Sequence, residues 1–195
     1  MIIFELIAII LSYLLGTIPT GLIVTKLFGK GDVRKKGSGN IGATNTLRVA
    51  GKWAGLITLV IDCAKGAIPV LIVSSYFSVV ETDAYIYCGI AAVLGHMFPV
   101  WLNFKGGKGV ATTFGVLAAA SQEFAMLLAV VFVLSFLPFR VVSIATLVTV
   151  MVATAVAALF MDGGQAMMVW VLSALIVYKH KANIQRLIAG EENKL

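Results

Sequence analysis

The stretch from Val141 to Phe160 reads VVSIATLVTVMVATAVAALF and contains no charged residue. A helix needs about 20 predominantly apolar residues to cross the hydrocarbon core of a bilayer. This stretch meets that length and therefore predicts a transmembrane helix. Similar apolar segments recur on both sides of it.

The composition of the whole chain agrees with a membrane location. Of its 195 residues, 60% are hydrophobic and only 12% are charged. Soluble domains carry about 25% charged residues, so this chain must place most of its surface in lipid. We expect one polytopic membrane domain over residues 1–195. No small-residue cleavage site follows the first apolar segment, so we expect it to be retained as a helix.

The apolar segments predict an all-α integral membrane protein, a bundle of about seven transmembrane helices. The fourth and fifth segments are short. They form either one helical hairpin with a tight turn at Ser121–Gln122, or one of them only half-spans the bilayer. Pro19 favours a bend near the inner end of the first segment. The expected spans are Ile2–Leu27, Trp53–Phe77, Ala84–Leu102, Val110–Ala120, Glu123–Leu137, Val141–Phe160 and Gln165–Tyr178.

The distribution of charge predicts the orientation of this bundle. With an odd number of spans, every lysine and arginine except Lys65 falls on one face. The other face receives only acidic residues, namely Glu5, Glu81, Asp83, Glu123 and Asp162. The positive-inside rule places the basic face in the cytoplasm. We therefore expect the N-terminus outside, the C-terminus in the cytoplasm and the glycine-rich loops on the cytoplasmic face.

The longest polar stretch, Phe28–Lys52, combines lysines with glycines. Its segment Gly37–Gly42 matches G-x-G-x-x-G, but no strand precedes it and no parallel sheet fits this chain, so we reject a dinucleotide fold. Glycine permits tight turns, and hydroxyl, amide and guanidinium groups donate to anions. The loop predicts an anion site, with contact to lipid headgroups as the alternative. The candidate ligands are Ser38, Gly39, Asn40, Thr44, Asn45 and Arg48.

A second glycine–lysine segment, Phe104–Gly109, lies between the third and fourth spans. It precedes a helix N-terminus, where the dipole and unpaired N–H groups favour an anion. Its spacing is not that of a Walker A loop. We interpret His96, deeper in the preceding span, as a packing or helix-bridging residue. The candidate phosphate ligands are Lys105, Gly106, Gly107 and Lys108.

The second span contains Asp62 and Lys65, followed by Gly66. Residues three apart share one face of a helix and can pair. Intramembrane ions usually face a bundle interior or a wet cavity. Two interpretations stay open. Lys65 is either a further cation for the anion site, oriented by Asp62, or half of a buried structural ion pair.

The C-terminal segment from Tyr178 predicts an interfacial amphipathic helix. His180, Asn183 and Arg186 follow one another at intervals of three residues and lie near one face. His180 is the histidine nearest the cytoplasmic interface, so it is our candidate general base. Anchoring of the tail to the membrane surface by its basic charge is the alternative.

Several familiar chemistries have no signature in this sequence. Cys63 and Cys88 lie in apolar segments and are interpreted as small buried hydrophobes. We find no metal-ligand cluster, no G-x-S-x-G elbow and no His-x-x-x-x-Asp motif. We therefore expect no metal site, no cofactor and no covalent nucleophile, and catalysis by positioning and charge stabilisation.

Linked motifs in this chain resemble the bacterial acyl-phosphate:glycerol-3-phosphate acyltransferases, the PlsY family. The motifs follow in order along nearly the whole chain, with one mild departure at Lys181-Ala182, where the family suggests arginine and an acidic residue. They are Gly37–Asn45, Asp62–Gly66, Gly95–Pro99 with Phe104–Gly109, and His180–Leu187.

The resemblance implies an enzyme of the bacterial inner (plasma) membrane that acts at the cytoplasmic face. It would make 1-acyl-glycerol-3-phosphate (lysophosphatidic acid) and phosphate from acyl phosphate and glycerol 3-phosphate, the first step of phospholipid synthesis. Two phosphorylated substrates account for two anion sites, and membrane lipid is the other expected partner, with no role for nucleic acid.

The expected mechanism is direct acyl transfer without an acyl-enzyme. Each loop holds one phosphate, and Lys65 lies between them. Either His180 or an oxygen of the acyl phosphate accepts the proton of the glycerol hydroxyl. We expect Asn183 beside His180, and Ser143 is a candidate for positioning the acyl group. The competing classes are an anion transporter or channel and a non-catalytic scaffold that binds anionic lipid.

Overall fold

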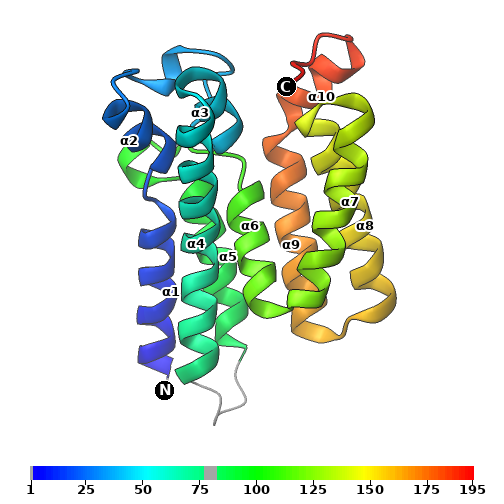
Figure 1. Ribbon diagram of the computed structural model, residues 1–195. Coiled ribbons are helices and arrows are strands. Elements are labelled where there is room, and N and C mark those ends of the chain that lie inside the picture. The colour runs from blue at the N-terminus through cyan, green and yellow to red at the C-terminus, as the bar shows by residue number, and fades with distance from the viewer. Residues whose placement is uncertain (1, 77–82) are drawn as a thin grey trace. The chain divides into compact units, whose positions relative to one another are not determined.

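The computed structural model describes residues 2–76 and 83–195, and within them the regular secondary structure is helical throughout. The chain forms two compact units, Met1–Ala120 and Ser121–Leu195 (Figure 1). The expected end of the second span at Phe77 and the acidic Glu81 lie outside the described residues.

The first unit is a helix bundle with short helices at one end (Figure 1). Helix α4 packs against α1, α5 and α6, and α1 also packs against α5. The short helices α2 and α3 both pack on α4. In chain order the elements are α1 (Ile2–Gly16), α2 (Thr20–Leu27), η1 (Val33–Lys35), α3 (Ala43–Ala50), α4 (Lys52–Tyr76), α5 (Ala84–Met97), η2 (Val100–Leu102) and α6 (Val110–Ala120).

The second unit has three long helices and one short one. Helix α8 packs against both α7 and α9, and α10 follows α9 directly. The elements are α7 (Gln122–Phe139), α8 (Val142–Phe160), α9 (Gly163–Lys179) and α10 (Lys181–Ile188).

The helices confirm the expected apolar segments. Among the residues that the structure describes, five stretches are long and apolar enough to cross a bilayer, and α6 and α9 are shorter apolar helices. Of the two short segments, the fifth extends to the 18 residues of α7, whereas α6 keeps its 11 residues. The hydroxyl of Ser121 caps α7 by accepting the N–H of Phe124, so α7 begins next to this residue. The hairpin and the half-span both stay open. The number of spans and their orientation stay predictions.

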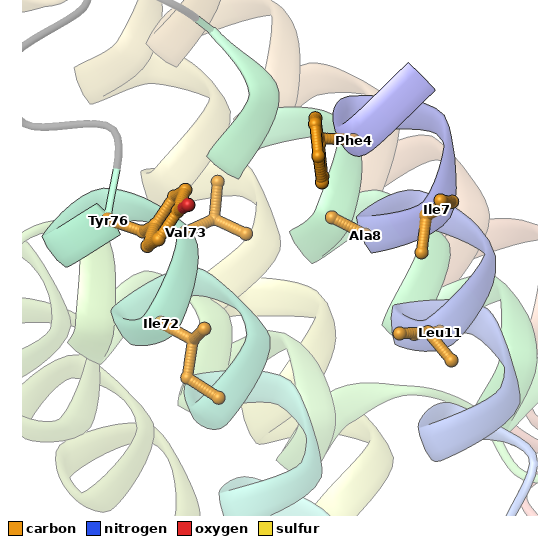
Figure 2. A pocket seen from close by; sticks show the side chains of 7 residues that line it. All are labelled: Phe4, Ile7, Ala8, Leu11, Ile72, Val73 and Tyr76. Carbon is orange, nitrogen blue, oxygen red and sulfur yellow. The ribbon is translucent and has the colours of Figure 1, made fainter. Parts of the chain in front are cut away.

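The outward surfaces of the helices are apolar, as a lipid-facing surface requires. Leu134 on α7 and Met151 on α8 are examples of large apolar side chains that are mostly exposed. Figure 2 shows a groove between the start of α1 and the end of α4, lined by Phe4, Ile7, Ala8, Leu11, Ile72, Val73 and Tyr76. This groove has almost no polar lining and lies at the opposite end of the unit from α2 and α3 (Figure 1). It therefore belongs to the lipid-facing surface.

The crossing of α4 and α6 depends on two glycines. A Cβ at Gly66 would overlap the backbone oxygen of Thr112, and a Cβ at Gly115 would overlap the backbone oxygen of Cys63. Small residues allow such close approach of helix backbones in a membrane. Gly66, an expected site residue, thus has a packing role at this crossing.

Candidate active site

The first helical segment breaks between α1 and α2, which confirms the expected bend at Pro19. Residues on two other elements hold this break. The ammonium of Lys65 donates to the carbonyl oxygen of Ile18 at 2.9 Å, and the indole N–H of Trp101 donates to the hydroxyl of Thr17 at 2.8 Å. The break is therefore a fixed corner of the first unit, from which α2 leads into the first polar loop.

Asn45 organises the first polar loop from within. Its side chain is buried, and its amide nitrogen donates to the carbonyl oxygens of Val33, Lys36 and Asn40 at 2.9–3.2 Å. Its amide oxygen accepts the backbone N–H of Ser38 at 2.9 Å. These bonds join three separate parts of the loop to one side chain, and they add to the backbone bonds that Val33 and Lys36 already accept. Asn45, an expected phosphate ligand, is thus committed to the protein itself.

The rest of the expected ligands of this loop lie nearer its surface. The side-chain oxygen of Asn40 accepts the N–H of Gly42 at 2.8 Å, which closes the turn before α3. Ser38, Gly39 and Arg48 are exposed, and Thr44 is half-buried. Ser38, Thr44 and Arg48 are therefore the side chains of this loop that are placed to meet a ligand.

Asp32 neutralises part of the basic charge of the same loop. Its carboxylate accepts from the side chain of Arg34 at 2.6 Å and from the backbone N–H of Arg34 at 2.9 Å. The bond from the guanidinium, together with the backbone bond, lowers the pKa of Asp32 from 3.8 to about 2. Arg34 is thus paired within the loop, whereas Arg48 approaches the surface from α3.

The second glycine–lysine loop folds back on the end of α5. Asn103 and Phe104 adopt left-handed backbone conformations, with φ of 50° and 60°. The backbone N–H groups of Gly106 and Gly107 then donate to the carbonyl oxygens of Met97 and His96, at 3.1 and 3.0 Å. These two N–H groups are therefore engaged with the protein, contrary to the expectation that they face an anion.

The lysines of this loop differ from its glycines in exposure. Lys105 is exposed and Lys108 is half-buried, whereas Gly107 is buried. The two glycines thus shape the loop, and the two lysines carry its positive charge outward.

Below this loop lies a buried ionic cluster formed by Asp62, Lys65 and His96. Their relative exposures are 1%, 3% and 4%. One carboxylate oxygen of Asp62 is 2.8 Å from the Lys65 ammonium and 3.6 Å from Nδ1 of His96. His96 lies on α5, so it bridges two helices, as expected from the sequence. Of the two interpretations of Lys65, these contacts favour the buried ion pair over a direct substrate ligand.

In the second unit, the carboxylate of Glu192 gathers two of the predicted catalytic side chains, Ser143 and Asn183, together with Arg186. One of its oxygens accepts from the hydroxyl of Ser143, at 2.9 Å, and from the amide of Asn183. The other accepts from Nε of Arg186 at 2.6 Å. Sequence reasoning missed Glu192. The available signal was the acidic pair Glu191-Glu192 in a mostly basic tail.

The environment of Glu192 shifts its titration. Burial raises the pKa of this carboxyl, but hydrogen bonds from Asn183, Arg186 and Ser143 outweigh that effect. The net result is a pKa below the ordinary value of 4.5. Glu192 is thus held as a carboxylate, and it orients both Ser143 and Asn183.

His180 lies at the junction of α9 and α10 and is only 2% exposed. Its Nδ1 is 2.8 Å from the carbonyl oxygen of Ile176. A carbonyl can only accept, so this contact requires the proton on Nδ1. The neutral ring then carries its lone pair on Nε2, which is the atom able to accept a proton.

The family of the chain follows from its sequence as a whole. The family model described as glycerol-3-phosphate acyltransferase matches residues 6–190. The chain belongs to this family. The matched residues include both polar loops and the cluster of Asp62, Lys65 and His96. They also include Ser143, Asn183 and Arg186, whereas Glu192 lies just beyond the match.

Two curated relatives carry the name glycerol-3-phosphate acyltransferase. The protein from Mesorhizobium japonicum is 44% identical over 191 residues, which cover 97% of this chain and 95% of the relative. The protein from Brucella anthropi is 45% identical over 190 residues, which cover 96% of this chain and 92% of the relative.

Two solved structures are similar to the chain, both at 40% identity and both covering 98% of this chain and 95% of the solved one. They are crystal structures of PlsY (YgiH), an integral membrane glycerol 3-phosphate acyltransferase. The glycerol 3-phosphate form matches with a TM-score of 0.92 and the lysophosphatidic acid form with 0.89. The chain is therefore a multi-pass integral membrane protein of the same fold.

Proposed function

We propose that the protein transfers a fatty acyl group from acyl phosphate to the 1-hydroxyl of glycerol 3-phosphate. The products are 1-acyl-glycerol-3-phosphate and inorganic phosphate. Membership of the acyltransferase family supports acyl transfer to glycerol 3-phosphate, and the relatives' structures contain that substrate and lysophosphatidic acid. Acyl phosphate as donor is our own assignment.

The observation that carries this proposal is the placement of the two polar loops. Both lie at the same end of the first unit, beside α2 and α3 (Figure 1). Each presents basic side chains outward, Arg48 from one loop and Lys105 from the other. Two phosphorylated substrates need two such groups, and charge-assisted hydrogen bonds are the strong ones.

The chemistry balances without a covalent intermediate. The hydroxyl oxygen of glycerol 3-phosphate attacks the acyl carbon, and the bond between that carbon and the phosphate oxygen breaks. The hydroxyl proton passes either to Nε2 of His180 or to an oxygen of the departing phosphate. Acyl phosphate is an activated anhydride, so orientation and charge stabilisation supply the rate enhancement.

We assign Ser38, Thr44 and Arg48 to one phosphate and Lys105 with Lys108 to the other. Asn183 and Ser143, oriented by Glu192, are assigned to positioning of reacting groups. We also propose that the site faces the cytoplasm from the bacterial inner membrane, since the basic residues gather on one face of the predicted topology.

Two charge-removing variants test the assignment of the loops. Removing one charged hydrogen-bond partner costs about 1.5–3 kcal/mol, or roughly 10- to 150-fold in binding. We expect Arg48→Met to raise KM for one substrate by that factor and Lys105→Met to raise KM for the other. Lys52→Met, which removes an exposed charge at the start of α4, is the matched control and should leave both KM values within about twofold.

The assay is phosphate release from acyl phosphate by purified protein in detergent, with and without glycerol 3-phosphate. Release that depends on glycerol 3-phosphate supports the acyltransferase. No release, together with phosphate flux in liposomes, would establish an anion transporter instead. If all three variants reduce turnover equally, the loops act only through general surface charge and the assignment fails.

A further inference from the structure

The buried cluster of Asp62, Lys65 and His96 lies beneath both polar loops, since Lys65 bonds to the carbonyl oxygen of Ile18 and Gly107 packs against the ring of His96. Asp62 and Lys65 lie on α4, and His96 lies on α5. Each of the three side chains is less than 5% exposed. The proposed reaction uses none of them directly.

Lys65 connects the cluster to the first loop. The Lys65 ammonium donates to the carbonyl oxygen of Ile18 at the α1–α2 corner. Helix α2 follows that corner and lies directly against the loop, because a Cβ at Gly21 would overlap the carbonyl oxygen of Ile41. A displacement of the corner therefore carries the first loop with it.

His96 connects the cluster to the second loop. Gly107 lies against the imidazole of His96, since a Cβ at this glycine would overlap ring atom Nε2. The backbone N–H of Gly107 also donates to the carbonyl oxygen of His96 at 3.0 Å. The position of the His96 ring therefore sets the position of Lys105 and Lys108 on either side.

The two loops also meet through apolar contacts. Leu22, Val33 and Ile41 form a small buried cluster under the first loop, and Leu102 of η2 packs against it. These contacts are non-directional. The ionic cluster adds directional bonds at fixed distances, which apolar packing does not supply.

Stability alone is a weak explanation for such a cluster. Removing two charges from water is costly, and replacing a buried ion pair with well-packed neutral residues is often neutral or stabilising. The cluster instead fixes the position of the α1–α2 corner relative to the turn at Gly107. It does so through three side chains on two helices.

We propose that Asp62, Lys65 and His96 are positioning residues that hold the two phosphate-binding loops at a fixed spacing. The inference rests on the proposed function, because it assumes that each loop holds one substrate. It differs from a direct role of Lys65 as a phosphate ligand, which would place the ammonium against substrate instead of Ile18.

Loss of the cluster should affect kcat and KM differently. Each loop is built by its own hydrogen bonds, around Asn45 in one case and against Met97 and His96 in the other. Each should keep its affinity for its own phosphate when the spacing changes. A misplacement of about 1 Å costs about a hundredfold in the rate of reaction between bound groups. We expect kcat to fall by about 10- to 100-fold while both KM values change by less than about threefold.

The test is the neutral double variant Asp62→Asn/Lys65→Met, compared with each single variant. The single variants leave one buried charge or its partner unmatched and should lower the melting temperature in detergent. The double variant should recover the melting temperature but not kcat. Thr58→Val removes a buried hydroxyl one turn earlier on α4, which bonds only to Ala54, and should leave kcat unchanged.

A direct measurement of spacing accompanies the kinetics. Spin labels at Lys35→Cys and Val100→Cys, with Cys63 and Cys88 replaced by alanine, report the distance between the loops. We expect a narrow distribution in the parent and a shifted or broader one in the double variant. His96→Gln serves as a second variant if the double variant does not fold, and it should give the same pattern.

Wild-type kcat in a folded double variant, or an unchanged distance distribution, would overturn the inference. A rise in KM for one substrate with kcat intact would also overturn it, because it would make Lys65 a ligand. An inactive parent protein, whose narrow distance distribution nevertheless shifts or broadens in the double variant, would instead remove the proposed function.

Discussion

Single buried polar side chains organise the functional segments of both units. Asn45 satisfies backbone groups of the first loop, and Glu192 gathers side chains in the tail. In each case one residue holds several polar groups from different parts of the chain. Loss of such a residue costs more than one hydrogen bond, because the remaining buried groups stay unsatisfied.

Asn45→Ala should destabilise the first loop strongly. It leaves the carbonyl oxygen of Asn40 and the N–H of Ser38 without this partner, at about 1–3 kcal/mol for each group that stays buried. It also removes a second donor from the carbonyl oxygens of Val33 and Lys36. We expect a lower melting temperature and a loss of activity of at least about tenfold. Asn40→Ala, which removes one bond to Gly42, should lower the melting temperature much less. Equal melting temperatures for the two variants would contradict the central role of Asn45.

Glu192 predicts a pH-dependent contribution to stability. Its folded-state pKa lies below the ordinary value of 4.5, so the unfolded chain binds this proton more tightly. The contribution is therefore fully present above about pH 4.5 and is lost as the pH falls through the folded-state pKa. At pH 7 we expect Glu192→Gln to melt about 2–4 °C below the parent protein.

Melting curves between pH 7 and pH 3 check this prediction. The difference between the parent and Glu192→Gln should shrink below pH 4.5, the ordinary pKa of glutamate. Glu191→Gln, a change at the exposed neighbouring residue, is the control and should follow the parent at every pH. A difference that stays constant across this range would show that the carboxylate charge is not involved.

For single residues, the sequence predicted which polar side chains matter better than it predicted their hydrogen-bond partners. It identified Asn45 and Lys65 as polar groups of functional segments, but it assigned Asn45 to substrate and left Lys65 open between a substrate contact and a structural ion pair. Which group bonds to which depends on contacts between distant segments, such as Lys65 with Ile18. Glycine motifs carry the same ambiguity, because Gly107 is required by the His96 ring and not by an anion.

At the scale of elements, breaks and close crossings of helices place the site. The α1–α2 corner turns the chain toward the first loop, and the left-handed residues before Gly106 return the second loop to α5. Pro19 predicted the corner because proline interrupts helical hydrogen bonding. Nothing in the local sequence predicted the return of the second loop, since Asn103 and Phe104 are not glycines.

Gly66→Ala tests whether this glycine serves packing or substrate. Its new Cβ would overlap the backbone of Thr112, and overpacking of this kind costs about 1–3 kcal/mol. We expect a lower melting temperature with KM unchanged in the protein that stays folded. Ile68→Ala, an exposed position on the same helix, should change the melting temperature little. A raised KM at a normal melting temperature would return Gly66 to the substrate site.

For the whole molecule, the hydrophobic pattern of the sequence predicted the fold class and the positions of most helices. A bilayer demands long apolar helices, so their positions follow from the sequence to within a few residues. The two short segments were harder, because the fifth extends to the 18 residues of α7 whereas α6 has only 11 and is shorter than a full span. The orientation of the bundle in the membrane is predicted from the uneven distribution of lysine and arginine, because the helices alone do not indicate which end faces the cytoplasm.

The central claim is direct acyl transfer between two phosphate-bearing substrates without an acyl-enzyme. The most direct test is rapid mixing of purified protein with acyl phosphate alone, followed by addition of glycerol 3-phosphate. We predict no burst of phosphate in the first step, and in the second step phosphate and 1-acyl-glycerol-3-phosphate in equal amounts. A phosphate burst stoichiometric with enzyme before glycerol 3-phosphate is added would contradict direct transfer.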